Sequence, residues 1–123
     1  MIEQYNTENL PTAQLVEKFE MLSPMIEAVF IEIKDLSKKK QNDSLNKLKI
    51  KMVNNILEQL KEILADEPTI QFLDLLDDET LSSNSDCVLI LAQYRSALSQ
   101  FKSKFYLRDP LSHECEWHTK ENP

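Results

Sequence analysis

The fold is decided by residues 15–36, which read LVEKFEMLSPMIEAVFIEIKDL. Apolar residues recur in this stretch at alternating intervals of four and three, the spacing that lines up side chains along one face of a helix. They are Leu15, Phe19, Leu22, Ile26, Val29, Ile33 and Leu36. Pro24 lies inside the stretch, where proline ordinarily kinks or ends a helix, yet the spacing keeps its phase across it. We therefore predict one kinked helix, or two nearly coaxial ones, beginning near Pro11 or Thr12.

Two further stretches have helical spacing. The second predicted helix is capped by Asp43 or Ser44 and runs to about Ala65, before Pro68. Its apolar face comprises Leu45, Leu48, Met52, Val53, Ile56, Leu60, Ile63 and Leu64. The third helix follows a cap among residues 83–85 and ends at Asp109-Pro110. Its apolar residues are Cys87, Leu91, Tyr94, Leu98, Phe101 and Phe105.

These patterns together predict an all-α fold, an antiparallel bundle of three long amphipathic helices plus a short helix near residues 69–78. We expect a frayed N-terminal segment at residues 1–10, the helical bundle at 11–109 and an aperiodic C-terminal tail at 110–123. The chain contains no glycine. Helical bundles tolerate this absence better than folds that need tight turns with positive φ.

Composition also argues against several functions. Without glycine the chain cannot form a phosphate-binding loop, a dinucleotide-binding glycine motif or a Gly-x-Ser-x-Gly nucleophile turn. The net charge of −7 argues against nucleic-acid binding, and no apolar run approaches the length of a membrane span. The N-terminus lacks a secretory signal pattern, and two cysteines are too few for a disulfide scaffold. We expect a cytoplasmic protein that is not an enzyme and carries no cofactor.

Positive charge is concentrated in residues 34–51, which contain seven lysines and two aspartates. A solubilising turn is the simplest interpretation of such a run. Phosphate contacts are a second, although no aromatic residue lies between Phe30 and Phe72 for bases to stack on. The lysines would equally suit an acidic partner or the acidic residues of a second copy.

The sharpest local cluster lies in the tail, where His113, Cys115 and His118 stand close together with Glu114 and Glu116. Imidazole and thiolate groups are good zinc ligands, so a small metal- or ligand-binding helical protein is the alternative function. The spacing matches no established zinc module. We expect these polar side chains to stay in solvent, without metal, while Trp117 packs on the bundle.

Two segments are too apolar for a surface helix, residues 25–33 and residues 87–92. Either the short helix near 69–78 covers the surplus, or another chain does, most simply in a homodimer. The candidate interface residues are Met25, Phe30, Ile31, Phe72, Leu76, Leu89 and Ile90. The sequence thus favours a non-enzymatic protein-interaction module, a regulator, inhibitor or adaptor that uses an apolar helix face rimmed by acidic residues.

Overall fold

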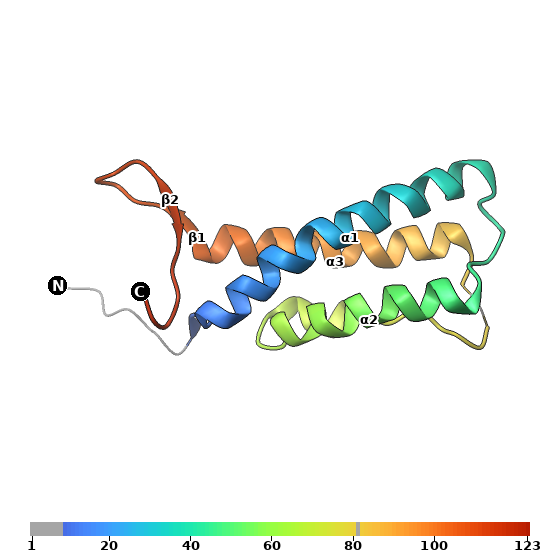
Figure 1. Ribbon diagram of the computed structural model, residues 1–123, viewed down its shortest axis with the longest axis horizontal. Helices are drawn as coiled ribbons and strands as arrows, with labels where there is room; N and C mark the ends of the chain where they lie inside the picture. The colour runs from blue at the N-terminus through green and yellow to red at the C-terminus, as the bar shows by residue number, and fades with distance from the viewer. Residues whose placement is uncertain (1–8, 81) are drawn as a thin grey trace.

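The computed structural model describes residues 9–80 and 82–123, and most of them are helical (Figure 1). The three α-helices are α1 (Ala13–Lys39), α2 (Lys47–Ile63) and α3 (Asn84–Phe105). A 3-10 helix, η2 (Pro68–Phe72), follows α2, and two short strands, β1 (Tyr106–Arg108) and β2 (Cys115–Trp117), follow α3. The expected helical fold class is confirmed. Of the predicted N-terminal segment 1–10, residues 1–8 lie outside the described part of the chain.

Each α-helix begins at a side-chain cap, which satisfies an amide that has no partner within the helix. The Thr12 hydroxyl accepts from the Leu15 amide at 3.1 Å, and the Ser83 hydroxyl accepts from the Asp86 amide at 3.2 Å. Both caps agree with the sequence prediction. The cap of α2 is Asn46, whose Oδ1 accepts from the Lys49 amide at 2.8 Å, and not Asp43 or Ser44. Ser44 is held outside the helix because it pairs with Ser83 in an isolated β-bridge.

α1 passes through Pro24 as a single helix. Proline removes one backbone donor from the helix interior. The flanking residues Leu22 and Ile26 are both buried in the core, and their burial favours a continuous helix on both sides of the proline. This selects the single-helix alternative over two coaxial helices.

α1 runs antiparallel to α2 and α3, whereas α2 and α3 run in the same direction (Figure 1). The starts of α2 and α3 are joined, because the Asn84 amide donates to the Asp43 carbonyl at 2.7 Å and the Ser85 amide donates to the Gln41 carbonyl at 3.1 Å. The expectation that all neighbouring helices are antiparallel therefore does not hold for this pair. The chain between them must travel back along α2.

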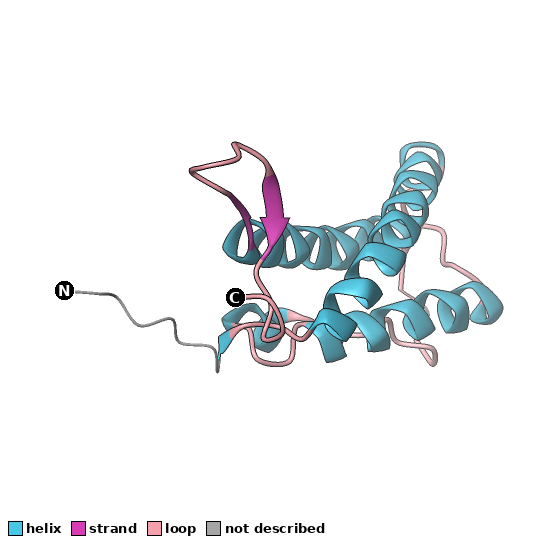
Figure 2. Cartoon of the chain, turned by 60° about the vertical axis from the view of Figure 1, so that its left-hand side comes forward, coloured by secondary structure: helices cyan, strands magenta, loops and turns pink. Residues whose placement is uncertain are grey.

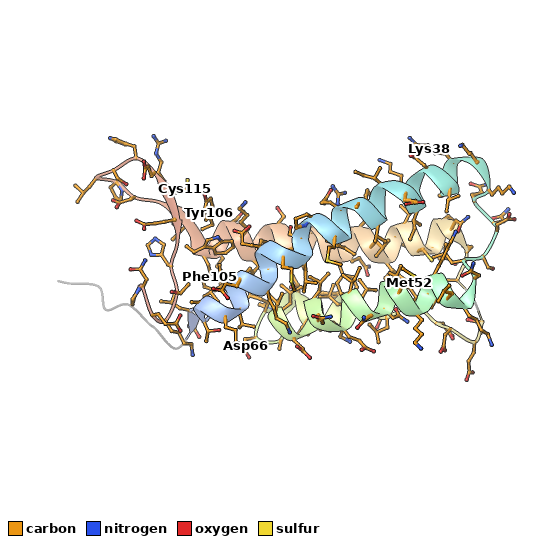
Figure 3. The ribbon with its side chains drawn as sticks, viewed as in Figure 1. Lys38, Met52, Asp66, Phe105, Tyr106 and Cys115 are labelled. Atoms are coloured by element: carbon orange, nitrogen blue, oxygen red, sulfur yellow. The ribbon has the colours of Figure 1, made fainter. Side chains whose placement is uncertain are left out.

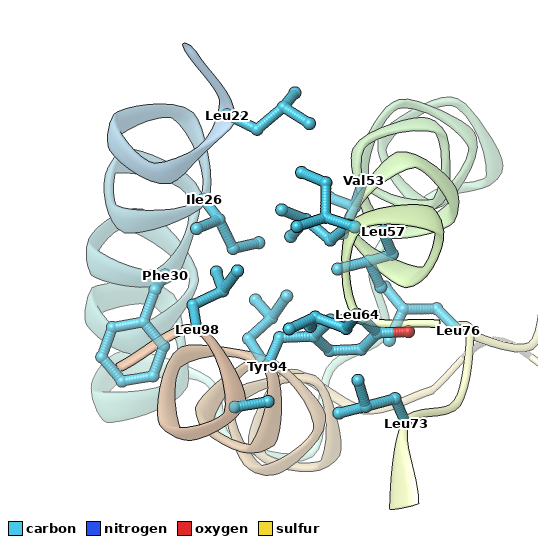
Figure 4. Close-up of a cluster of buried hydrophobic side chains, with 14 of the residues drawn as sticks. Leu22, Ile26, Phe30, Val53, Leu57, Leu64, Leu73, Leu76, Tyr94 and Leu98 are labelled. Carbon is cyan, nitrogen blue, oxygen red and sulfur yellow. The ribbon is translucent and has the colours of Figure 1, made fainter. Parts of the chain in front are cut away.

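The expected helix at 69–78 is replaced by η2 and a non-helical return segment, residues 73–80. α2 has 17 residues and is about 25 Å long, a distance that eight extended residues can cover and eight helical residues cannot. Leu73 and Leu76 of this segment are buried beside Tyr94, between α2 and α3 (Figure 4). The Asn54 side chain holds the segment, since its Nδ2 donates to the Leu76 carbonyl and its Oδ1 accepts from the Leu76 amide, both at 2.8 Å.

The core is filled from all three helices, and the six predicted apolar positions of α3 are all buried. The predicted face of α2 is wrong in part. Ile50 and Leu57 are fully buried although they were not assigned to it, whereas Leu48 and Met52 are 67% and 62% exposed. The segment from 47 to 52 alternates lysine with apolar residues, so more than one apolar face was available to sequence reasoning.

Part of the tail pairs as a strand, although its sequence shows no periodicity. α3 ends at Phe105, before the predicted Asp109-Pro110, and β1 then pairs antiparallel with β2 (Figure 2). Trp117 packs edge-on against Phe19, and its indole nitrogen donates to the Glu20 carboxylate at 2.7 Å. The Lys120 amide donates to the Pro11 carbonyl at 2.9 Å. The tail is therefore fastened to the start of α1. None of the described helices is long and apolar enough to cross a membrane.

Candidate functional site

A hollow of about 540 Å³ lies between the second half of α1 and the first half of α2. We call it the α1–α2 groove. Its walls are apolar side chains on both helices, and buried core residues form its floor. The lining residues are Met25, Val29, Glu32, Ile33, Leu36, Leu45, Asn46, Leu48, Lys49, Met52, Val53, Asn55 and Ile56.

Three large side chains stand in solvent at this groove, Met25, Leu48 and Met52, with exposed fractions of 46%, 67% and 62%. Single exposed apolar residues are common on protein surfaces and need no explanation. Several gathered in one hollow are typical of a binding surface. Burying each such side chain is worth roughly 1.5–3 kcal/mol, so a partner that covers them would gain binding free energy that the chain alone does not realise.

The two helices converge at one end of the groove and diverge at the other (Figure 1). At the converging end the Lys18 ammonium and the Glu62 carboxylate form an ion pair at 2.8 Å between α1 and α2. Toward the turn at residues 40–46 the helices move apart, which leaves Leu48 and Met52 uncovered. The open end of the groove therefore lies beside the α1–α2 turn.

The lysine cluster, which we define as the lysines at positions 34, 38, 39, 40, 47, 49 and 51, is divided among the last part of α1, the turn and the start of α2, the segments that adjoin this open end. All seven are exposed, and Lys49 is itself a lining residue. Lys38 lies near the end of α1, and Met52 lies in the first half of α2 (Figure 3). Glu32 supplies negative charge on the α1 wall. Among the lining residues themselves, the only charged side chains are thus Glu32 on α1 and Lys49 on α2.

The interface candidates on α1 separate into three different environments. Met25 lines the groove, whereas Ile31 is exposed on α1 and lines a second, shallow hollow together with Glu32. Phe30 is only 8% exposed, because the Arg95 guanidinium lies 4.0 Å from its ring centre. Phe30 is therefore covered by its own chain and offers no free surface.

The remaining candidates are also divided. Leu89 is exposed on α3, Ile90 is half-buried, and Phe72 is exposed on η2. Leu76 is a buried residue of the return segment. These residues do not share a hollow with Met25. Leu48 and Met52 were missed as surface residues because their spacing equally suits a core face.

The perturbed titratable groups belong to the core or to turns. Burial raises the pKa of the Cys87 thiol to about 11, and it also raises the pKa of the Tyr94 hydroxyl, which donates to the Asp74 carbonyl at 2.8 Å. Backbone amides of the following residues lower the pKa of Asp77 and of Asp109. The raised values follow from packing, so they do not identify an acid or a base for catalysis.

The tail cluster is spread over the hairpin. His113 occupies the turn at a positive φ of 62°, Cys115 is exposed on β2, and the His118 ring bonds to the Pro123 carbonyl at 2.9 Å. Within residues 9–80 and 82–123, no group of three or more histidine, cysteine or acidic side chains is placed to hold a metal ion.

Comparisons with known proteins do not assign this site. No protein-family model matches the chain, and no significant match was found among curated proteins or solved structures.

Proposed function

We propose that the protein is a non-enzymatic interaction module, a regulator, inhibitor or adaptor, that binds one amphipathic helix of a partner protein in the α1–α2 groove. The observation that carries this proposal is the gathering of Met25, Leu48 and Met52, each about half exposed or more, in one hollow between two helices. An apolar hollow of this kind is the usual receptor for the apolar face of a helix.

The dimensions of the groove suit a short helix. Its α1 wall extends from Met25 to Leu36, about 16 Å or three helical turns. A helix laid between the diverging ends of α1 and α2 would present side chains at intervals of three and four to the two walls. The docked helix would occupy the place of a fourth helix in a bundle.

The side chains of the groove favour adaptable binding. Two of its three most exposed apolar residues are methionines, whose unbranched, flexible side chains adjust to different partner surfaces. The charged residues at the edge of the proposed site are Lys49 on α2 and Glu32 on α1. We place the protein in the cytoplasm, a proposal that the free thiols of Cys87 and Cys115 support.

The test is photo-crosslinking from the groove inside cells that express the full chain. A photoreactive phenylalanine analogue replaces Met52, and the matched control carries it at Leu111, which is 91% exposed on the tail hairpin. We expect one discrete partner to be captured from position 52 and absent from position 111. Equal capture from both positions, or none from position 52, would contradict the proposal. Crosslinks only to a second copy of the chain would instead assign the groove to the homodimer expected from the sequence.

A further inference from the structure

We infer that the helix bound by the α1–α2 groove is acidic along the flank that faces α2, so that its carboxylates meet Lys47, Lys49 and Lys51 of the lysine cluster while its apolar stripe meets Leu48 and Met52. This inference rests on the proposed function of the groove. It names the chemistry of the partner and the orientation in which the partner helix lies.

The lysine cluster has no acidic partner among the described residues, although the Lys34 ammonium lies over the Phe30 ring, 5.7 Å from its centre. In the described part of the chain, none of its seven lysines forms an ion pair, although three bases elsewhere do so. Lys18 pairs with Glu62, Arg95 with Glu27 and Lys104 with Glu67. Only two aspartates lie within residues 34–51 to offset the cluster. The cluster therefore produces a positive field at the open end of the groove.

The position of the α2 lysines is informative, because it opposes local helix preference. Lysines at the C-terminal end of a helix, such as Lys38 and Lys39 of α1, are favoured by the helix dipole. Lysines at an N-terminal end are disfavoured, yet α2 begins with Lys47, Lys49 and Lys51 and has no acid in its first turn. A sequence that breaks a local rule without a gain in the folded chain points to function at that position.

A carboxylate from a partner would offset the unfavourable placement of lysines at the N-terminal end of α2. Lys49 lines the groove directly, and it lies between Leu48, which faces the groove, and Ile50, which is fully buried. A helix that covers Leu48 and Met52 therefore passes beside Lys49 and the start of α2. Acidic side chains on that flank would interact favourably with the lysine and with the positive end of the helix dipole.

The opposite wall fixes the orientation. Glu32 is the charged residue that α1 contributes to the groove lining. A carboxylate facing this wall would meet like charge, whereas a lysine or a neutral residue would not. The opposite charges of Glu32 and Lys49 in the groove lining favour one orientation of the bound helix, as flanking charges do in paired helices.

The test is a selection from a phage library, with the full chain as bait. The library displays 18-residue helices with leucine fixed along one face and glutamate, lysine or glutamine randomised at the flanking positions. The Leu48→Asp/Met52→Asp variant is the counter-bait, and both changes fall on exposed positions, so its circular dichroism is expected to match that of the parent chain. We expect the selected peptides to be enriched in glutamate on one flank. Their binding should be at least tenfold weaker to a Lys49→Glu/Lys51→Glu variant and unchanged to the matched Lys102→Glu/Lys120→Glu control.

The outcomes separate the two proposals. Selected peptides with lysine or glutamine on both flanks, or equal loss of binding in both charge-reversed variants, would overturn the acidic-partner inference and leave the groove as a helix-binding site. No enrichment over the counter-bait would overturn the proposed function itself. Tighter binding of a 20-nucleotide single-stranded RNA than of the best peptide would assign the lysine cluster to nucleic acid. A dimer in light scattering that Leu48→Asp/Met52→Asp dissociates would assign the groove to a second copy.

Discussion

Replacing Asn54 with alanine should destabilise the protein by detaching the return segment from α2. The Asn54 side chain makes two hydrogen bonds of 2.8 Å to the backbone of Leu76, one as donor and one as acceptor. Leu76 is buried, so alanine leaves an amide and a carbonyl without these partners in a partly buried place. Each net hydrogen bond contributes about 1 kcal/mol, and each unsatisfied buried group costs about 1–3 kcal/mol. Because water reaches part of the site, we expect a total loss of about 2 kcal/mol.

The assay is urea unfolding followed by circular dichroism, with Asn55→Ala as the matched control. Asn55 is the adjacent residue on α2, is exposed, and has no side-chain hydrogen bond within the described residues. Hydrogen exchange should show the Leu76 amide losing protection in Asn54→Ala before the core of α3 does. If Asn54→Ala costs no more than Asn55→Ala, the two bonds do not hold the return segment and our account of it is wrong.

Two further predictions concern the core and its thiol. Leu57→Ala should lower the free energy of unfolding by about 2–5 kcal/mol because Leu57 is fully buried, whereas Leu48→Ala should change it by less than about 0.5 kcal/mol. If urea unfolding shows similar losses for the two variants, Leu48 is not the exposed groove residue that the structure describes. Cys115 should react with a thiol reagent at pH 8 at once, and Cys87 only upon unfolding; equal rates would show that Cys87 is accessible. Burial raises the pKa of Cys87 from 9.0 to about 11, so as pH rises the thiol keeps its proton longer in the folded state than in the unfolded state. The stability linked to the protonated thiol is therefore complete below pH 9 and is lost between pH 9 and about pH 11. Because buried Tyr94 also destabilises the fold above pH 10, the comparison is made between pH 9 and pH 10, and a Cys87→Ala variant that loses as much stability there as the parent would contradict this assignment.

The parts of the fold that were predictable depend on one local pattern. α3 has a regular apolar stripe from Cys87 to Phe105, and its spacing identified six buried positions; Asn84 and Ala97, which are also buried, were not assigned to it. α1 was predicted for the same reason, and the cap at Thr12 follows from residue type alone. Both cases need only the period of a helix and the chemistry of its first turn.

The parts that were not predictable depend on contacts between distant residues. The return segment takes its conformation from Asn54 and Tyr94, which lie about 20 residues away in the sequence and supply its hydrogen bonds. The tail hairpin is fastened by Trp117 to Glu20, at the other end of the chain. No periodicity within either segment encodes these contacts.

The candidate site was only partly visible in the sequence. Met25 was identified because its surroundings are too apolar for a surface helix, and the lysine run was identified by charge. Leu48 and Met52 were assigned to the core, since alternating lysine and apolar residues leave the buried face of α2 undetermined until α1 and α3 are packed against it. The groove therefore depends on how α1 and α2 diverge in the folded chain, and the sequence of neither helix alone predicts this divergence.

The most direct test of the account is a methyl NMR titration of the full chain with the most enriched helical peptide. Methionine and leucine methyl groups are labelled, so that Met25 and Met52 report on the groove while Leu89, exposed on α3 and outside the groove, serves as the reference. We predict that the Met25 and Met52 signals shift together in proportion to peptide bound and that the Leu89 signal does not move. Binding that shifts Leu89 and leaves Met25 and Met52 unchanged would show that the α1–α2 groove is not the binding site.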